Sequence, residues 1–240
     1  MTSSPRFDML PRTLEPELMD SVEDAVGYDR MDHSAVNRVF VDDLLAVWNN
    51  EQPAADPQPL AACRLLDVGT GTAQIPVELA GRVTGCRVVA IDLASEMLRL
   101  ARRNVSTAGF DDRITVEHVD AKAMPFADDR FDGVISNSIV HHIPKPAVVL
   151  DEMIRVLAPG GLLFVRDLSR PPDLDTVNRL VDAYAGDETA HARQMFRQSL
   201  HAALTVEEVS QLLGEAGLPA NLVRQTTDRH WTISGRCDRQ

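Results

Sequence analysis

The stretch Leu65-Leu66-Asp67-Val68-Gly69-Thr70-Gly71-Thr72-Ala73 decides the fold of this 240-residue chain. It runs from an apolar strand through an acid into a glycine-rich turn, and a helical pattern follows. Glycine adopts backbone angles that other residues avoid and lets the chain approach a ligand closely. The start of the next helix presents free N–H groups. The stretch therefore predicts a strand–turn–helix unit that binds a small nucleoside-like ligand.

The spacing of the glycines indicates which ligand fits. A dinucleotide-binding turn needs glycine at its first, third and sixth positions, but the sixth position counted from Gly69 is Gln74, whose bulky amide opposes a pyrophosphate. Asp67 places a carboxylate two residues before the first glycine, where it repels phosphate and attracts an ammonium or sulfonium group. These features favour S-adenosylmethionine over a nicotinamide dinucleotide.

Five motifs follow one another in the order and spacing of a known family. In chain order they are Leu66–Thr72, Val89–Leu93, Val119–Ala121, Phe131–Asn137 and Arg155–Gly161. With these motifs the chain resembles the class I S-adenosylmethionine-dependent methyltransferases of the small-molecule type, closely over residues 64–168. Ala73 stands where many members carry a third glycine, a position that matters mainly for close helix packing. The resemblance implies a methyltransferase with S-adenosylmethionine as cofactor and S-adenosylhomocysteine as product.

Composition bounds the class of protein. The chain has 44% hydrophobic residues and a formal net charge of −12 with its acids spread along the chain, so we expect no nucleic-acid partner. No apolar run approaches the roughly 20 residues that span a bilayer, and the first residues lack the pattern of a signal peptide. We therefore expect a cytoplasmic enzyme with a small-molecule acceptor and no membrane partner; the sequence leaves the oligomeric state open. The three cysteines form no Cys-x-x-Cys pair, which favours reduced thiols.

Segments of strand and helix character alternate along the chain. Seven strands are predicted, at residues 64–68, 87–92, 114–118, 133–137, 162–167, 221–225 and 231–234. The alternation predicts an α/β fold with a Rossmann-like, seven-stranded, mostly parallel sheet, an antiparallel edge strand and helices on both faces. Proline at its start predicts a helix over Pro146–Leu157, and Thr205 with Glu208 predicts a capping box.

Two segments lie outside this alternation. Residues 1–59 are predicted to form an N-terminal helical arm and linker that cover the cofactor, and residues 60–240 to form the methyltransferase domain. Residues 170–200 predict a helical insertion after the fifth strand, where two prolines interrupt the pattern. Ligands of open α/β sheets bind beyond the carboxyl ends of the strands, so both segments are expected to cap that edge.

Residues at the predicted strand ends are the candidates for cofactor binding. Asp92 ends the second strand about 20 residues after the glycine turn, the position from which a carboxylate binds both ribose hydroxyls; a helix N-cap is its alternative role. By resemblance Asp120 and Ala121 contact the adenine, and Asn137 faces the amino group of the methionine moiety. The predicted cofactor residues are Tyr28, Asp67, Gly69, Thr70, Gly71, Asp92, Leu93, Met97, Asp120, Ala121 and Asn137.

The catalytic prediction rests on His141, His142 and Asp167. Methyl transfer is an in-line displacement, so the protein aligns the acceptor and removes its proton, and histidine suits that step near neutral pH. We predict His142 as the general base, with His141 as the alternative and Asp167 orienting the imidazole or binding the acceptor. Histidines that only pack in a loop are the other interpretation. Adjacent histidines rarely share one ion and no spaced third ligand is visible, so no metal is expected.

The pattern of these residues resembles sugar and natural-product O-methyltransferases, which implies oxygen as the methylated atom. N-, S- or C-methylation stays open. From other classes, a nicotinamide-dependent oxidoreductase shares the expected sheet, and a non-catalytic S-adenosylmethionine-binding protein shares the expected pocket.

Overall fold

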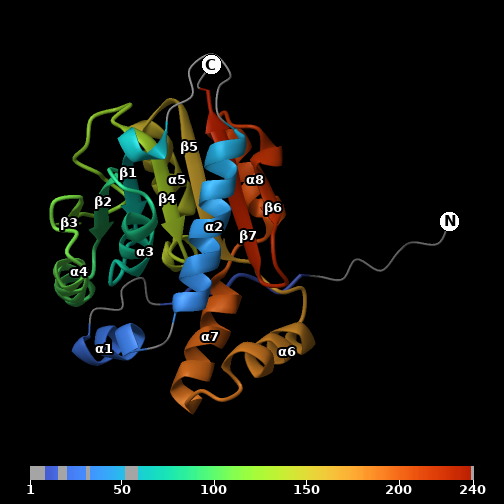
Figure 1. Cartoon of the computed structure of the whole chain (residues 1–240). Coiled ribbons are helices and arrows are strands. Elements are labelled where there is room, and N and C mark those ends of the chain that lie inside the picture. Colours follow the sequence, from blue (N-terminus) through green and yellow to red (C-terminus); the bar gives the residue numbers. More distant parts are fainter. Residues whose placement is uncertain (1–8, 16–20, 31–32, 52–58, 239–240) are drawn as a thin grey trace.

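The computed structural model describes residues 9–15, 21–30, 33–51 and 59–238. At its centre lies a seven-stranded sheet in the order β3-β2-β1-β4-β5-β7-β6 (Figure 1). The strands are β1 (Arg64–Val68), β2 (Arg87–Asp92), β3 (Ile114–His118), β4 (Phe131–Asn137), β5 (Leu157–Leu168), β6 (Val223–Gln225) and β7 (His230–Cys237). Strands β1 to β5 pair in parallel, whereas β7 runs antiparallel between β5 and β6. The predicted mostly parallel sheet is confirmed, with its antiparallel strand one place inside the edge.

Helices cover both faces of this sheet. One face is covered by α2 (Ser34–Asn50), α3 (Gln74–Arg82) and α4 (Ser95–Ala108), and the other by α5 (Pro146–Val156) and α8 (Val206–Glu215). Figure 1 shows three further helices beyond one end of the sheet: α1 (Val22–Arg30), α6 (Leu174–Ala185) and α7 (Ala190–Ala202). Short 3₁₀ turns are η1 (Leu60–Ala62), η2 (Val140–His142) and η3 (Ala220–Leu222). The predicted insertion after the fifth strand is thus α6 and α7.

The predicted N-terminal arm divides into two parts. Helix α2 buries Phe40, Leu44 and Trp48 against the sheet, and the Phe40 ring meets Phe164 of β5 edge to face, with centroids 5.0 Å apart. Each such side chain contributes roughly 1.5–3 kcal/mol by its burial, so α2 is a layer of the core. Among the described residues of the arm, α1 and residues 9–15 remain to cover the strand ends, and the predicted linker lies largely outside the described residues.

Local signals set several element boundaries. The Thr205 hydroxyl accepts from the backbone N–H of Glu208, and the Glu208 carboxylate accepts from that of Thr205, so the predicted capping box is confirmed. Helix α5 begins at Pro146 and ends at Val156. Strand β5 starts earlier than predicted because Leu157 already pairs with Phe131, ahead of a register shift.

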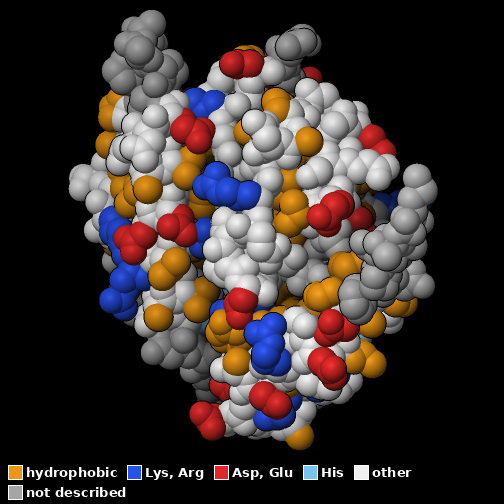
Figure 2. All heavy atoms as spheres, turned by 90° about the vertical axis from the view of Figure 1, so that its right-hand side faces the viewer, with side chains coloured by type: hydrophobic (Ala, Val, Ile, Leu, Met, Phe, Trp, Pro, Cys, Tyr) orange, Lys and Arg blue, Asp and Glu red, His pale blue; other side chains and the backbone are white. Residues whose placement is uncertain are grey.

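Charge and hydropathy are distributed as the composition suggests. Figure 2 shows acidic and basic side chains interspersed on the face that carries α8 and α6, without an area of one sign. No helix among the described residues is long and apolar enough to cross a membrane. Cys63, Cys86 and Cys237 are buried free thiols.

Candidate active site

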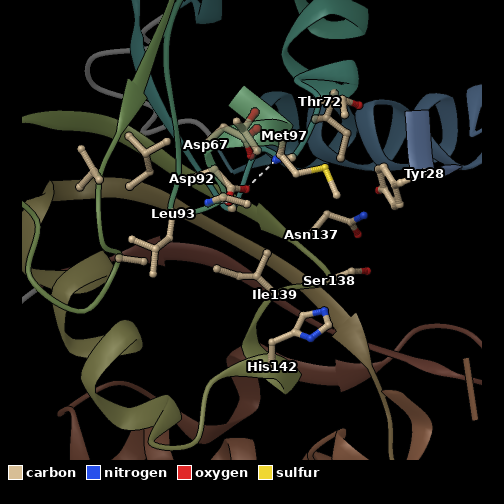
Figure 3. A pocket seen from close by; sticks show the side chains of 18 of the residues that line it. Tyr28, Asp67, Thr72, Asp92, Leu93, Met97, Asn137, Ser138, Ile139 and His142 are labelled. Atoms are coloured by element: carbon tan, nitrogen blue, oxygen red, sulfur yellow. Dashed lines mark hydrogen bonds between the residues drawn. The ribbon is translucent and has the colours of Figure 1, made fainter. Parts of the chain in front are cut away.

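A pocket opens at the carboxyl ends of β1, β2 and β4, where the strand order reverses and ligands of such sheets bind. Every predicted cofactor residue lines it, and Figure 3 shows several of them converging on one space. Sequence reasoning missed further lining residues. These include Asn37 from α2, Thr72 and Gln74 from the glycine turn, Lys122 after β3, and Ser138 and Ile139 after β4.

The glycine turn needs glycine for two different reasons. Gly69 has a φ of +73°, and a Cβ there would lie 2.0 Å from the Ile139 side chain. Gly71 has a φ of +54° and faces Tyr28, whose nearest ring carbon would be 3.9 Å from an added Cβ. Ala73 also has a left-handed backbone, with a φ of 59°, which costs an alanine roughly 1–2 kcal/mol. The third position therefore sets backbone conformation as well as helix packing, which corrects the sequence interpretation.

Asp92 holds the turn in place. Its Oδ2 accepts from the N–H of Gly71 at 2.8 Å, and its Oδ1 accepts from the N–H of Ala94 at 2.9 Å. Burial raises the pKa of Asp92, and these backbone N–H groups oppose that rise. Helix α4 begins after Ala94 without a side-chain cap, so the bonds of Asp92 brace the loop on the pocket floor.

Asp67 is the buried acid of the site. Asp67 is 2% exposed. Its Oδ2 has no hydrogen-bond partner among the described residues. Burial raises the pKa of Asp67 to about 7. Thr70 in the same turn opposes this rise by a side-chain hydrogen bond, and Thr72 similarly lowers the pKa of Asp29. A buried carboxylate oxygen without a partner in a pocket suits a ligand that brings a cation and hydrogen-bond donors, as S-adenosylmethionine does.

This pKa predicts a pH-dependent affinity. S-adenosylhomocysteine carries an ammonium group, which favours ionised Asp67, so binding must release a proton wherever free Asp67 is protonated. We expect affinity to rise with pH and to level off above about 7, being about tenfold weaker one pH unit below that value. Calorimetry in buffers of different ionisation enthalpy measures both the affinity and the number of protons released on binding. In Asp67→Asn the dependence should vanish, and a flat profile in the wild type would contradict the assignment.

Helix α1 closes one side of the pocket. Ala25 packs with Met97 and Leu100 of α4, and Asp29 forms an ion pair with Arg103 and accepts from Asn104 at 2.8 Å. Arg103 of α4 thus supplies the ion-pair partner that fixes α1. Tyr28, on the same helix, lines the pocket beside Gly71.

We expect Tyr28→Ala to weaken S-adenosylhomocysteine binding by about three- to tenfold, because an aromatic contact contributes roughly 0.5–1.5 kcal/mol beyond its buried area. The other tyrosine provides a matched control: Tyr184 lies on α6 and bonds to Asp228, away from the pocket-lining residues. Tyr184→Ala should leave the affinity unchanged. Equal affinity in Tyr28→Ala and wild type, measured by the same titration, would show that α1 is not a cofactor lid.

The two histidines of η2 have different surroundings. His141 is 3% exposed and does not line the pocket; its Nδ1 lies 2.5 Å from Asp167 Oδ1, and its backbone N–H donates to Asp167 Oδ2 at 3.1 Å. Burial lowers the pKa of His141, but the Asp167 carboxylate outweighs it and the net shift is upward. Burial by itself raises the pKa of Asp167, but the charge and hydrogen bond of His141 outweigh burial, so the pKa of Asp167 is lowered overall. Asp167 is thus paired with the inner imidazole and is not a pocket-lining residue, which corrects the predicted contact with the acceptor.

His142 is the histidine that lines the pocket. Its side chain is 21% exposed, and Figure 3 shows its imidazole below Ile139 and Ser138. The His141 and His142 rings lie face to face, with centroids 4.0 Å apart and planes inclined by 35°. The carboxylate beside His142 is Glu15, whose Oε1 lies 3.0 Å from His142 Nδ1.

Sequence reasoning missed Glu15, because no local pattern places residue 15 beside residue 142. Glu15 also lies 3.5 Å from His141 Nε2, and one ligand atom from each of the three residues falls within 4.8 Å of the others. The structure therefore places a third possible metal ligand, Glu15, beside the two histidines, which the sequence did not indicate.

Comparisons with known proteins show which family this chain is similar to. A family model described as "Methyltransferase domain" matches residues 60–217. The chain is 35% identical over 169 residues to demethylmenaquinone methyltransferase of Clavibacter sepedonicus, covering 66% of each chain. It is 33% identical over 109 residues to the ubiquinone/menaquinone biosynthesis C-methyltransferase UbiE of Geotalea daltonii, covering 45% of this chain and 46% of that one. These matches span less than two thirds of the curated relatives' own length.

A solved structure shows the same fold. A SAM-dependent methyltransferase from Aquifex aeolicus superposes with a TM-score of 0.62 at 18% identity, covering 90% of this chain and 98% of that one.

Proposed function

Because this chain belongs to the class I S-adenosylmethionine-dependent methyltransferases, we propose that it transfers a methyl group to a small molecule that carries a hydroxyl group. One observation carries the proposal: Asp67, whose buried Oδ2 has no partner among the described residues, and the imidazole of His142 line the same pocket. The first suits the cationic cofactor, and the second suits proton removal from an acceptor. S-adenosylmethionine supplies a methyl group activated by a positively charged sulfur.

The cofactor residues are assigned by their places in the pocket. Asp67 would bind the ammonium group and Asp92 the ribose hydroxyls, since each acid ends a neighbouring strand. Asp120 and the N–H of Ala121 would bind the adenine between Leu93 and Met97. Lys122 pairs with Asp120 at 3.1 Å, which holds that carboxylate at the rim. Asn137 would direct its carbonyl toward the ammonium group.

The chemical step requires little from the protein beyond alignment and one proton transfer. His142 takes the proton of the acceptor hydroxyl while the oxygen–methyl bond forms and the sulfur–methyl bond breaks, leaving imidazolium, methyl ether and S-adenosylhomocysteine. Ile139 and Ile143 line the same part of the pocket as His142, and apolar walls suit a flat, weakly polar acceptor.

C-methylation is the second candidate, because the relatives named above act on a demethylmenaquinone or are named C-methyltransferases. A quinol ring hydroxyl that loses its proton makes the neighbouring ring carbon nucleophilic. The same histidine would then serve either product, and the position of the acceptor would decide between oxygen and carbon.

Transfer of a ¹³C-labelled methyl group tests both candidates. The protein is incubated with the labelled cofactor and a panel of phenols, hydroquinones and sugars, and carbon NMR of the products separates methoxy from ring-methyl carbons. Parallel titrations with S-adenosylhomocysteine and NAD address the other classes. Binding of NAD alone would indicate an oxidoreductase, and tight S-adenosylhomocysteine binding without transfer to any acceptor would indicate a non-catalytic binding protein.

We expect this protein to work without a nucleic-acid partner. The net charge of −12 opposes binding to a polyanion. We propose the cytoplasm as its location and a free small molecule as its acceptor.

A further inference from the structure

Glu15 reaches the active site from the N-terminal side of the chain. Its carboxylate is 9% exposed, and Oε1 lies 3.0 Å from His142 Nδ1. The other oxygen, Oε2, is 3.2 Å from the Ser199 hydroxyl of α7, which donates to it. The carboxylate is therefore held between α7 and the pocket-facing histidine.

The segment that carries Glu15 is hydrogen-bonded to both elements that flank this contact, η2 and α7. The Arg12 guanidinium donates to the carbonyls of His141 and Ile143 at 3.1 and 3.0 Å, and to the Ala202 carbonyl at 2.6 Å. The N–H of Thr13 donates to the carbonyl of His201 at 3.0 Å. Residues 12–15 thus bridge η2 and α7, and the bridge fixes Glu15 relative to His142.

The contact between Glu15 and His142 has a specific chemical meaning. Glu15 Oε1 and His142 Nδ1 are both buried without a hydrogen-bond partner among the described residues, and they lie 3.0 Å apart without the alignment of a hydrogen bond. Leaving either buried atom unpaired costs about 1–3 kcal/mol. A proton on Nδ1 shared with the carboxylate satisfies both atoms. Such bonds are often poorly aligned until substrate binds. With the proton on Nδ1, the lone pair of His142 is on Nε2.

We propose that Glu15 is a positioning residue for His142: its carboxylate holds the proton on Nδ1, leaves Nε2 free to accept the proton of the acceptor hydroxyl, and stabilises the imidazolium that results. The inference rests on the proposed function. It also explains why two carboxylate–imidazole pairs lie side by side. Asp167 lies against Nδ1 of the buried His141, and Glu15 lies against Nδ1 of the pocket-facing His142.

A divalent cation between Glu15, His141 and His142 is the competing interpretation of the same cluster. The surroundings favour the proton-holding role. The positive charge of Arg12 acts on His141 and opposes a second cation there. The ligand count does not decide, because three ligands with an open fourth position are the composition of a catalytic zinc site.

Glu15→Gln tests the proposal with little change of shape, and Glu188→Gln on the exposed loop after α6 is the matched control. We expect Glu15→Gln to lower kcat for a hydroxyl acceptor by about tenfold to a hundredfold, a share of what a general base contributes. The affinity for S-adenosylhomocysteine should stay within about twofold of wild type, Glu15→Asp should regain part of kcat, and the control should match wild type. The defect should shrink with thiol acceptors, which are partly ionised near neutral pH.

Three results would overturn the proposal. One is an equal loss of kcat for hydroxyl and thiol acceptors together with weaker cofactor binding, which indicates a packing role. Another is unchanged kcat in Glu15→Gln. The third is loss of wild-type activity in a chelator with recovery on adding Zn²⁺, which indicates a metal site.

A spectroscopic measurement separates this proposal from the proposed function. In long-range ¹H–¹⁵N spectra, with the His142 signals assigned by their loss in His142→Ala, the wild type should carry its proton on Nδ1, and Glu15→Gln should shift that tautomer. This readout needs no acceptor. If no acceptor is methylated but the tautomer behaves as expected, the function fails and the positioning role stands; a proton on Nε2 in the wild type overturns the role itself.

Discussion

Replacing His142 with alanine is expected to lower kcat for a hydroxyl acceptor by about 10²–10⁴-fold, the range that a positioned general base contributes. Of the two histidines on η2, His142 lines the pocket and His141 does not, so the loss should belong to His142. The affinity for S-adenosylhomocysteine should change little, because the acids proposed to bind it lie on other strands. Single-turnover kinetics with labelled cofactor measures the step.

Two controls make this result specific. His191→Ala removes an exposed histidine on α7 and should leave kcat unchanged. A thiol acceptor should lose far less rate in His142→Ala than a hydroxyl acceptor, since it needs little help to ionise. Nearly full turnover of the hydroxyl acceptor by His142→Ala would mean that the histidine only packs in its loop.

Asp167→Asn is expected to act on stability instead, lowering the free energy of unfolding by about 3–5 kcal/mol, as breaking a buried ion pair does. Asp167 is fully buried and His141 is its partner. Turnover per folded molecule should fall much less than in His142→Ala, because the Asp167 carboxylate is hydrogen-bonded to His141 and acts on the pocket-facing His142 only through its charge. Urea unfolding measures the change, and Asp182→Asn, which breaks an exposed pair with Arg193, should cost no more than about 1 kcal/mol.

The pH dependence of stability checks the same pair. The net pKa of Asp167 is lowered, so its contribution is present above the unfolded-state pKa of an aspartate and is lost as the pH falls through the lowered value. The net pKa of His141 is raised, so its contribution is present below the unfolded-state pKa of histidine and is lost as the pH rises through the raised value. Asp167→Asn should lack both losses. A variant that unfolds with the wild-type pH profile would show that the pair does not stabilise the fold.

The fold was largely predictable because its signals are local. The first three strands have the predicted bounds, since apolar runs between polar turns define them. Strand β5 was predicted too short because its first residues pair with Phe131 across a register shift, and pairing between distant segments leaves no periodicity in either one. The place of α2 in the core was missed for a similar reason: its buried face is recognisable only against the sheet that it covers.

The site was predictable to the extent that it is built from strand ends. Most of the predicted cofactor residues line one pocket because parallel strands bring their carboxyl ends together, and Tyr28 and Met97 reach it from α1 and α4. The partner of each histidine was not predictable, because the rings of His141 and His142 lie 4.0 Å apart but their Nδ1 atoms meet carboxylates from distant parts of the chain, Asp167 and Glu15. Glu15 is held at the site because nearby Arg12 donates hydrogen bonds to carbonyl groups far along the chain. No motif or spacing in the sequence indicates such a contact.

The position of β7 has a consequence for how the chain is made. Because β7 lies between β5 and β6, a nascent chain that has not yet reached residue 230 has β5 as an open edge and β6 without a neighbour. Exposed edges of this kind invite pairing with other chains, and partly synthesised domains are prone to such misassembly. The yield of folded protein should therefore depend on how long the β5 edge stays unpaired during translation. A chaperone that covers the edge, or elongation fast enough to shorten this time, should raise the yield.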